Sequence, residues 1–460
     1  MSTRIFIKDE YGPEDMAMVQ ALYSRSAKSV EEHFKIVESK GSGNFMEEYL
    51  CNYGHKSIGD CGSTTIFIEN VSMLAAKAFQ DNQMYSGQET STRYIDMSKQ
   101  SISDPLNTFQ SRAVLSKWME FYHTSIPILT EYLKTKYPRK EDENENIYKK
   151  AIKARAFDIL RGFIPAGLNT NLSWHTNLRQ AHDKLSTLKY HPDMTIRNIA
   201  ISTLKSLKEK YPHSFKYKEY EEVEKYNQKI AEKYTYFKES STRYELADTG
   251  ELSDSDELPD TDKRHDASEL AVSDNINTFL LCEFRDDLKS RVRGTELPRF
   301  LDDVGYITTV FKMDFGSFRD IQRHRASVNR MPLLTLNHGF EEWYLQQLPQ
   351  DLQEKARSLI KDQEIEIKAL GCDEITMQYY IPMGYKVACH FTYRLPALVY
   401  LVELRSQNTV HTTLRKVIHS MARWLEKNYP FIKLYVDYSQ DEWDIRRGEQ
   451  DIVKKNGESI

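Results

Sequence analysis

Two segments of the sequence share one pattern, and this duplication constrains the fold more than any other feature. Residues 63–83, STTIFIENVSMLAAKAFQDNQ, and residues 306–325, YITTVFKMDFGSFRDIQRHR, each begin with β-branched and aromatic residues typical of a strand. Each run then passes through a short predicted turn into a stretch of helical character. The segments align without a gap when Asp81 is placed on Arg323. We therefore expect two diverged copies of one unit.

A second pair of matching segments supports the duplication. Residues 164–179, IPAGLNTNLSWHTNLR, precede a helical stretch that closes on LKSLKEKYP, and YRLPALVYLVELR precedes one that closes on MARWLEKNYP. The final Tyr-Pro pair ends a helix because the residue before proline avoids helical backbone angles. Each copy should run strand, helix, motif loop, variable region and helix pair. This order predicts an α+β fold in which each repeat has a small antiparallel sheet packed with long helices.

An acidic segment separates the two copies. Residues 247–269 are rich in Asp, Glu, Ser and Thr and contain almost no aliphatic side chains. Such a segment cannot bury enough apolar surface to fold alone, so we expect an exposed linker. The predicted domains are an N-terminal repeat, residues 1–246, and a C-terminal repeat, residues 270–460.

Composition excludes several classes of protein. A net charge of -5 disfavours non-specific nucleic-acid binding, which usually requires a basic surplus. We expect no signal peptide and no membrane span, because the N-terminus lacks a basic stretch with an apolar run and no window approaches about eighteen apolar residues. Five widely spaced cysteines without a Cys-x-x-Cys pair disfavour a disulfide framework or a zinc site. A cytoplasmic protein is the simplest expectation.

The second half contains a dense cationic motif, Gln322-Arg323-His324-Arg325. Two guanidiniums and an imidazole in a row can bind phosphates or the pyrimidine edge of a flavin. Consecutive side chains on a helix diverge by about 100°, so such a motif suits a junction that ligands or subunits approach from several sides. A cluster of interface salt bridges is the alternative interpretation.

The first half contains two polar motifs. In SGQETSTRY, residues 86–94, Ser91 and Arg93 suit a phosphate, while Glu89 suits a sugar hydroxyl. A polar surface turn is the alternative. In GHKSIGD, residues 54–60, His55 is either a structural histidine or a base that titrates near neutral pH.

Taken together, these motifs resemble the flavin-dependent thymidylate synthase (ThyX) family. Its hallmark is Arg-His-Arg followed by Ser-x-Arg-Tyr, with Gly-His-x-(Ser/Thr)-x-x-(Glu/Asp) upstream and Asn-x-Arg downstream. The first half has the upstream element and the Ser-x-Arg-Tyr, but Asp81-Asn82-Gln83 stands where the triad should be. The second half keeps Arg323-His324-Arg325 but continues ASVNRMPLLT, without Ser-x-Arg-Tyr. Each half thus looks like one diverged ThyX-like repeat.

The resemblance implies a composite nucleotide site. In the family, each active site lies between subunits of a homotetramer, and two subunits contribute complementary shares. In this sequence Asp81 replaces one expected arginine of the first half and Leu188 replaces another. The share retained in the first half is Glu89, Ser91, Arg93 and Arg161, and the share retained in the second half is Arg323 and Arg405, to which the resemblance also gives catalytic roles.

The resemblance also implies FAD as cofactor. The residues that match the family's flavin-facing positions are His55, Ser57, Asp60, Asn177, Arg179, His324 and Arg325. The implied reaction is reductive methylation of dUMP to dTMP, with methylenetetrahydrofolate as the one-carbon donor and NADPH as reductant. No cysteine stands in the Pro-Cys setting of the ordinary thymidylate synthase nucleophile.

Two alternatives remain open at this point. The altered sequence after Arg325 is compatible with a ThyX-like enzyme that acts on another pyrimidine nucleotide, such as UMP or a deoxycytidylate. The loss of half of each motif is compatible with a non-catalytic nucleotide-binding homologue. If two repeats stand for two subunits, a homodimer should form a pseudo-tetramer.

Overall fold

The computed structural model describes residues 5–93, 95–141, 143–237 and 270–439. The predicted linker, residues 247–269, lies outside them. The chain forms two compact units, each assembled from segments far apart in the sequence. Unit 1 comprises Met1–Val71, Ala75–Glu89 and Thr170–Thr235, and unit 2 comprises Ser72–Leu74, Thr90–Asn169 and Tyr236–Ile460. Unit 2 therefore contains residues of both halves of the sequence.

Unit 1 is built on a two-stranded sheet, β1 (Ser63–Ser72) and β2 (Asn169–Asn177). Trp174 on β2 packs with Phe79 and Tyr85, and this cluster joins the strands to the helices that follow them. The helices of this part of the chain are α1 (Pro13–Tyr23), α2 (Val30–Lys40), α3 (Gly43–Phe45), the π-helix η1 (Met46–Asn52), α4 (Ser57–Asp60), α5 (Met73–Gln80), α8 (Leu178–Leu188), α9 (Met194–Lys210) and α10 (Glu221–Tyr234).

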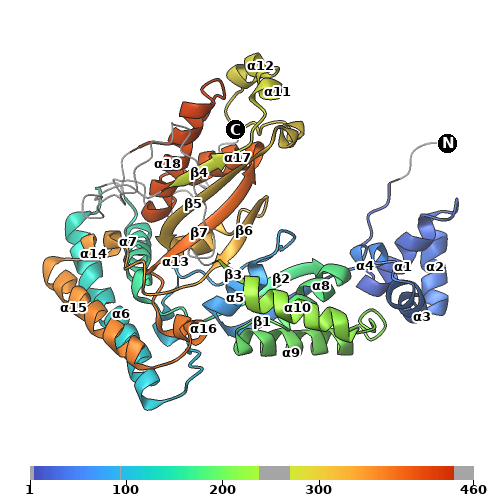
Figure 1. The fold of residues 1–460 in the computed structure, drawn as a ribbon, viewed down its shortest axis with the longest axis horizontal. Coiled ribbons are helices and arrows are strands. Elements are labelled where there is room, and N and C mark those ends of the chain that lie inside the picture. Colours follow the sequence, from blue (N-terminus) through green and yellow to red (C-terminus); the bar gives the residue numbers. More distant parts are fainter. Residues whose placement is uncertain (1–4, 94, 142, 238–269, 440–460) are drawn as a thin grey trace, which may run out of the picture. The chain divides into compact units, whose positions relative to one another are not determined.

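Unit 2 contains a five-stranded sheet in the order β3-β6-β7-β5-β4 (Figure 1). All pairs are antiparallel except β3 with β6. The strands are β3 (Tyr236–Phe237), β4 (Ala271–Asp274), β5 (Tyr306–Asp314), β6 (Ser327–Pro332) and β7 (Lys386–Arg394). Alternate residues of β5 are buried, which is the pattern of a strand with one face on a core. Mixed helix and sheet confirms the predicted α+β class.

Unit 2 contains helices of both halves together with this sheet. From the first half come η2 (Met97–Lys99), α6 (Phe109–Lys136), α7 (Glu145–Leu160) and η3 (Arg161–Phe163). From the second half come α11 (Thr278–Cys282), α12 (Arg285–Ser290), η5 (Arg299–Val304), α13 (Phe315–Ile321), α14 (Glu342–Gln346), α15 (Gln350–Ala369), α16 (Glu374–Met377), η6 (Gln378–Tyr380), α17 (Leu395–Arg405) and α18 (Thr412–Asn428). Helix α6 of the first half packs on α15 of the second.

The same order of elements occurs in both halves. β1 leads into α5 as β5 leads into α13, and β2 leads into α8 and α9 as β7 leads into α17 and α18. The C-cap residues of α9 and α18 are Tyr211 and Tyr429, each followed by proline, as predicted. The prediction of a turn between strand and helix is wrong, because each helix starts at the residue directly after the strand. In the second half the last strand residue, Asp314, caps α13 by accepting from the Ser317 amide at 2.8 Å.

Two equivalent segments, 162–167 and 379–384, pair with each other inside unit 2; we call them the paired Ile-Pro segments. The amide of Ala166 donates to the carbonyl of Ile381 at 2.9 Å, and the amide of Met383 donates to the carbonyl of Ile164 at 2.9 Å. Gly167 and Gly384 repeat this reciprocity with Tyr379 and Gly162, at 3.0 and 2.8 Å. The pairing joins the first half to the second and fixes Arg161, which directly precedes it.

Close packing at this pairing predicts that Gly384→Ala destabilises the protein. An added Cβ would lie 2.4 Å from the ring of Phe340 and 2.7 Å from the carbonyl oxygen of Gly162. Overpacking of this kind costs about 1–3 kcal/mol, so the midpoint of thermal unfolding should fall. Gly12→Ala is the control, because its Cβ would meet nothing closer than 3.9 Å. Equal unfolding midpoints for the two variants would contradict the role given to the pairing.

Candidate functional site

Arg93 forms a two-point ion pair with Asp158 of α7. Its Nε and Nη2 donate to the two carboxylate oxygens, with Nη2 2.7 Å from Oδ2. The Arg93 side chain remains 17% exposed, whereas that of Asp158 is 6% exposed. Planar two-point pairs fix the orientation of a guanidinium. Ser91 accepts from the Arg93 amide at 3.3 Å and so helps to shape the same turn.

Arg161 is almost completely buried, with 1% of its surface exposed. Its Nη1 lies 3.3 Å from the Asp320 carboxylate, its Nη2 donates to Ser317 and its Nε donates to the hydroxyl of Tyr344, both at 3.3 Å. Burial lowers the pKa of Arg161, but Tyr344 and the carboxylates Asp320 and Asp314 outweigh burial and raise it. Direct contact between Arg161 and a phosphate, as predicted from the sequence, would require this buried arrangement to open.

Arg405, at the end of α17, binds the histidine of the Arg-His-Arg motif. Its Nε donates to Nε2 of His324 at 2.6 Å, and its Nη2 donates to the carbonyl of Asp320 at 3.4 Å. Burial and the charges of Arg405, Arg323 and Arg325 lower the pKa of His324 to about 3. The imidazole is therefore neutral near pH 7, and its Nε2 serves as an acceptor.

Asp320 lies in the combined field of arginines from both halves. Burial raises the pKa of its carboxyl, but Arg161, Arg93 and Arg405 lower it to about 2. Burial lowers the pKa of Arg405, and repulsion from Arg323 and Arg93 lowers it further. The arginines of the two halves are therefore close enough to affect one another.

This arrangement suits an anionic ligand. Like charges held close together in a partly buried place destabilise each other until an anion binds, which is why such clusters often mark functional sites. Arg323 is exposed beyond the end of α13, and Arg325 is half-buried. We call Arg93, Arg161, Arg323 and Arg405, together with the carboxylates Asp158 and Asp320, the arginine cluster. Sequence reasoning missed both carboxylates.

A second group of predicted residues lies in unit 1. Arg179 donates to Asp60 at 2.7 Å and lies 3.6 Å from Asp183, and the hydrogen bond to Asp60 raises the pKa of Arg179. Asn177 caps α8 by accepting from the Gln180 amide at 2.8 Å. The side chains of His55 and Ser57, at the start of α4, are exposed.

Glu89 lies in unit 1 with a buried lysine. Its carboxylate is 2.9 Å from Nζ of Lys77 and accepts from the side-chain amide of Gln80 at 3.0 Å. Lys77 occupies the position in α5 that Arg319 occupies in α13 under the gapless alignment of the two halves. A buried ion pair of this kind fixes Glu89 against α5, the helix that carries Lys77.

The predicted site residues therefore divide between the two compact units. Unit 2 brings together Ser91, Arg93, Arg161, Arg323, His324, Arg325 and Arg405. Unit 1 contains His55, Ser57, Asp60, Glu89, Asn177 and Arg179.

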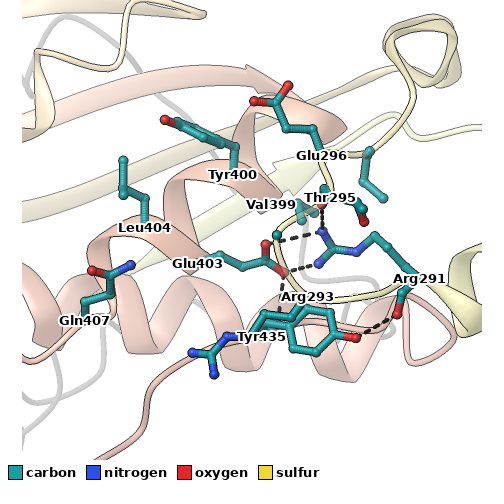
Figure 2. A pocket seen from close by; sticks show the side chains of 12 residues that line it. Arg291, Arg293, Thr295, Glu296, Val399, Tyr400, Glu403, Leu404, Gln407 and Tyr435 are labelled. Atoms are coloured by element: carbon teal, nitrogen blue, oxygen red, sulfur yellow. Dashed lines mark hydrogen bonds and ion pairs between the residues drawn. The ribbon is translucent and has the colours of Figure 1, made fainter. Parts of the chain in front are cut away.

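A cavity of about 250 Å³ lies on another face of α17, between this helix and residues 291–297 (Figure 2). Two of its lining residues, Arg291 and Glu403, form an ion pair, and Glu403 also accepts from the Tyr435 amide at 2.9 Å. Tyr400 lines this cavity, and its ring centroid lies 6.1 Å from that of His324. Tyr400 therefore lies between this cavity and His324, the hydrogen-bond partner of Arg405.

In the part of the chain that the structure describes, no helix combines the length and the apolar character needed to cross a membrane.

Comparison with known proteins gives relatives across most of the chain. UPF0159 proteins of Chlamydia pneumoniae and Chlamydia muridarum are 26% identical over 455 and 456 residues, which is 90% of this chain and 84% of each relative. The UPF0159 protein of Thermoplasma acidophilum is 23% identical over 451 residues, 85% of this chain and 87% of the relative.

Two crystal structures of ThyX from Helicobacter pylori, with FAD and dUMP, also match. They are 14% and 16% identical, cover 44% of this chain and 94% and 93% of the other chain, and superpose with a TM-score of 0.28.

The family profile described as "Thymidylate synthase complementing protein" matches residues 8–213. This stretch includes the Gly-His-x-Ser element, the Ser-x-Arg-Tyr loop and the Asn-x-Arg element of the first half. Residues 8–213 are thus similar to the thymidylate synthase complementing protein family, in agreement with the ThyX-like motifs of the first half.

Proposed function

We propose that the protein is a flavin-dependent thymidylate synthase that converts dUMP to dTMP at a site built from both halves of the chain. The observation that carries the proposal is the arginine cluster. Arg93 of the first half and Arg405 of the second belong to one compact unit, and their charges act on the same carboxylate, Asp320. These are arginines that the resemblance assigns to complementary shares of one nucleotide site.

The proposed roles follow from exposure and charge. Arg93, partly exposed and oriented by Asp158, binds the phosphate together with Ser91. Arg323 and Arg405 stabilise negative charge that develops on the pyrimidine ring, and loss of one such donor typically costs about 2–4 kcal/mol of transition-state stabilisation. Arg161 is better suited to hold Asp320 than to touch the ligand, because it is buried among protein partners.

FAD is the proposed cofactor, and it would supply the hydride chemistry when bound. The unit 1 residues fit such a ligand: the exposed side chains of His55 and Ser57 offer donors, and Asp60 holds Arg179 in a fixed orientation. In unit 2, His324 and Arg325 are the residues that the resemblance assigns to the flavin. Methylenetetrahydrofolate and NADPH are the proposed co-substrates.

The segment after Arg325 favours a second candidate, a ThyX-like enzyme with another pyrimidine nucleotide as substrate. Where the family has its Ser-x-Arg-Tyr loop, this half forms β6, whose Ser327 and Arg330 pair with β7. A non-catalytic nucleotide-binding homologue is the third candidate, and the absence of a bound flavin in the purified protein would favour it.

Turnover of dUMP tests the proposal directly. Purified protein with FAD, methylenetetrahydrofolate and NADPH should form dTMP, as measured by mass spectrometry. UMP and dCMP in parallel reactions separate the first two candidates, because methylation of either one in place of dUMP would favour the second. Bound, reducible flavin without any methylated product from the three nucleotides would contradict both.

We also propose that two chains assemble into a pseudo-tetramer, because two diverged repeats in one chain would stand for two subunits of the family's homotetramer. Light scattering coupled to size-exclusion chromatography should give twice the mass of one chain at micromolar concentration. A stable monomer under these conditions would be incompatible with the proposed assembly.

A further inference from the structure

Three of the four arginines in the arginine cluster are held by the protein in one common way. In each of Arg93, Arg161 and Arg405 the Nε donates to a protein acceptor, respectively Asp158, Tyr344 and His324. The Nε side of a guanidinium faces back toward its own chain. A bond at that position fixes the plane of the group while leaving the terminal Nη atoms to point away.

For Arg93 this leaves a donor for a ligand. Asp158 occupies Nε and Nη2, and within the described residues Nη1 has no acceptor. The Arg93 side chain is also the more exposed member of the pair. Asp158 therefore fixes the orientation of the Arg93 guanidinium and leaves Nη1 available to a ligand.

Arg405 shows the same geometry with a different partner. Its Nε donates to Nε2 of His324 and its Nη2 reaches the carbonyl of Asp320, while Nη1 has no acceptor in the described part of the chain. Only a neutral imidazole can accept this bond, and burial, together with the charges of Arg405 and Arg323, lowers the pKa of His324 and so favours the neutral ring. His324 is thus the partner of Arg405 in addition to its proposed place near the cofactor.

We propose that Asp158 and His324 are positioning residues that preorganise one arginine from each half for the same nucleotide monophosphate. Asp158 acts through Arg93 on the phosphate, and His324 acts through Arg405 on the ring. The nature of the ligand rests on the proposed function, whereas the positioning itself requires only that an anion binds the arginine cluster. Preorganisation strengthens binding because the side chains lose less conformational entropy when the ligand arrives.

Calorimetric binding of dUMP and of inorganic phosphate to the full chain tests this proposal. Asp158→Asn and His324→Leu should each weaken dUMP binding about 3- to 10-fold, the effect of releasing one ordered side chain. His324→Gln keeps an acceptor and should restore most of the affinity. His419→Leu is the control, since His419 lies on α18 and, within the described residues, its ring is hydrogen-bonded to the carbonyl of Asp437 and to no member of the arginine cluster. Thermal unfolding verifies that each variant is folded.

Double variants separate positioning from a general structural effect. If Asp158 acts through Arg93, Asp158→Asn should have no further effect on dUMP binding once Arg93 is Ala, and likewise for His324→Leu in Arg405→Ala. Additive losses, unchanged affinity in the single variants, or tighter binding by Asp158→Asn would overturn the proposal; the last result would make Asp158 a competing counter-ion. If wild type binds phosphate but not dUMP, the proposed function fails and phosphate serves as the probe. If it binds neither, both proposals fail.

Discussion

The electrostatic balance around Asp320 is the interaction on which the candidate site depends. Arginines that would otherwise repel one another lie near this carboxylate. Their combined charge lowers the pKa of Asp320 well below its usual range, so the carboxylate stays ionised. Arg161 of the first half contacts the Asp320 carboxylate, and the backbone carbonyl of Asp320 accepts from Arg405. Removing a buried partner from such a network leaves uncompensated charge, so the members are expected to act as a unit.

The backbone makes this balance possible. The paired Ile-Pro segments join the halves by reciprocal hydrogen bonds, and Arg161 stands at the entrance of one of them. On the other side, Asp320 and Arg405 lie in the last turns of α13 and α17, and both helices start directly after the neighbouring strands β5 and β7. We interpret the arrangement as two repeats within one chain, in which each keeps the part of the site that the other has lost.

Local patterns in the sequence predicted the elements well. β-branched runs indicated β1 and β5, Tyr-Pro pairs indicated the ends of α9 and α18, and the family motifs singled out Arg93, Arg323 and Arg405. The partners of these arginines could not be predicted in the same way. Asp158 and Asp320 are two of 68 acidic residues, and what distinguishes them is contact across long stretches of chain.

One signal for Asp320 was available. An aspartate in the last turn of a helix interacts unfavourably with the helix dipole. The position of Asp320 in α13 therefore indicates that a nearby cation compensates its charge. The composition of the compact units had no such signal, because segment 90–169 joins the second half through contacts that no periodic pattern encodes.

If the proposed function holds, both halves together form one nucleotide site per chain. Calorimetric titration of dUMP into the purified protein measures this directly through its stoichiometry. One dUMP should bind per chain, and alanine at either Arg93 or Arg405 should abolish or strongly weaken this binding. Two equivalent dUMP molecules per chain, or binding that depends on only one of these arginines, would contradict it.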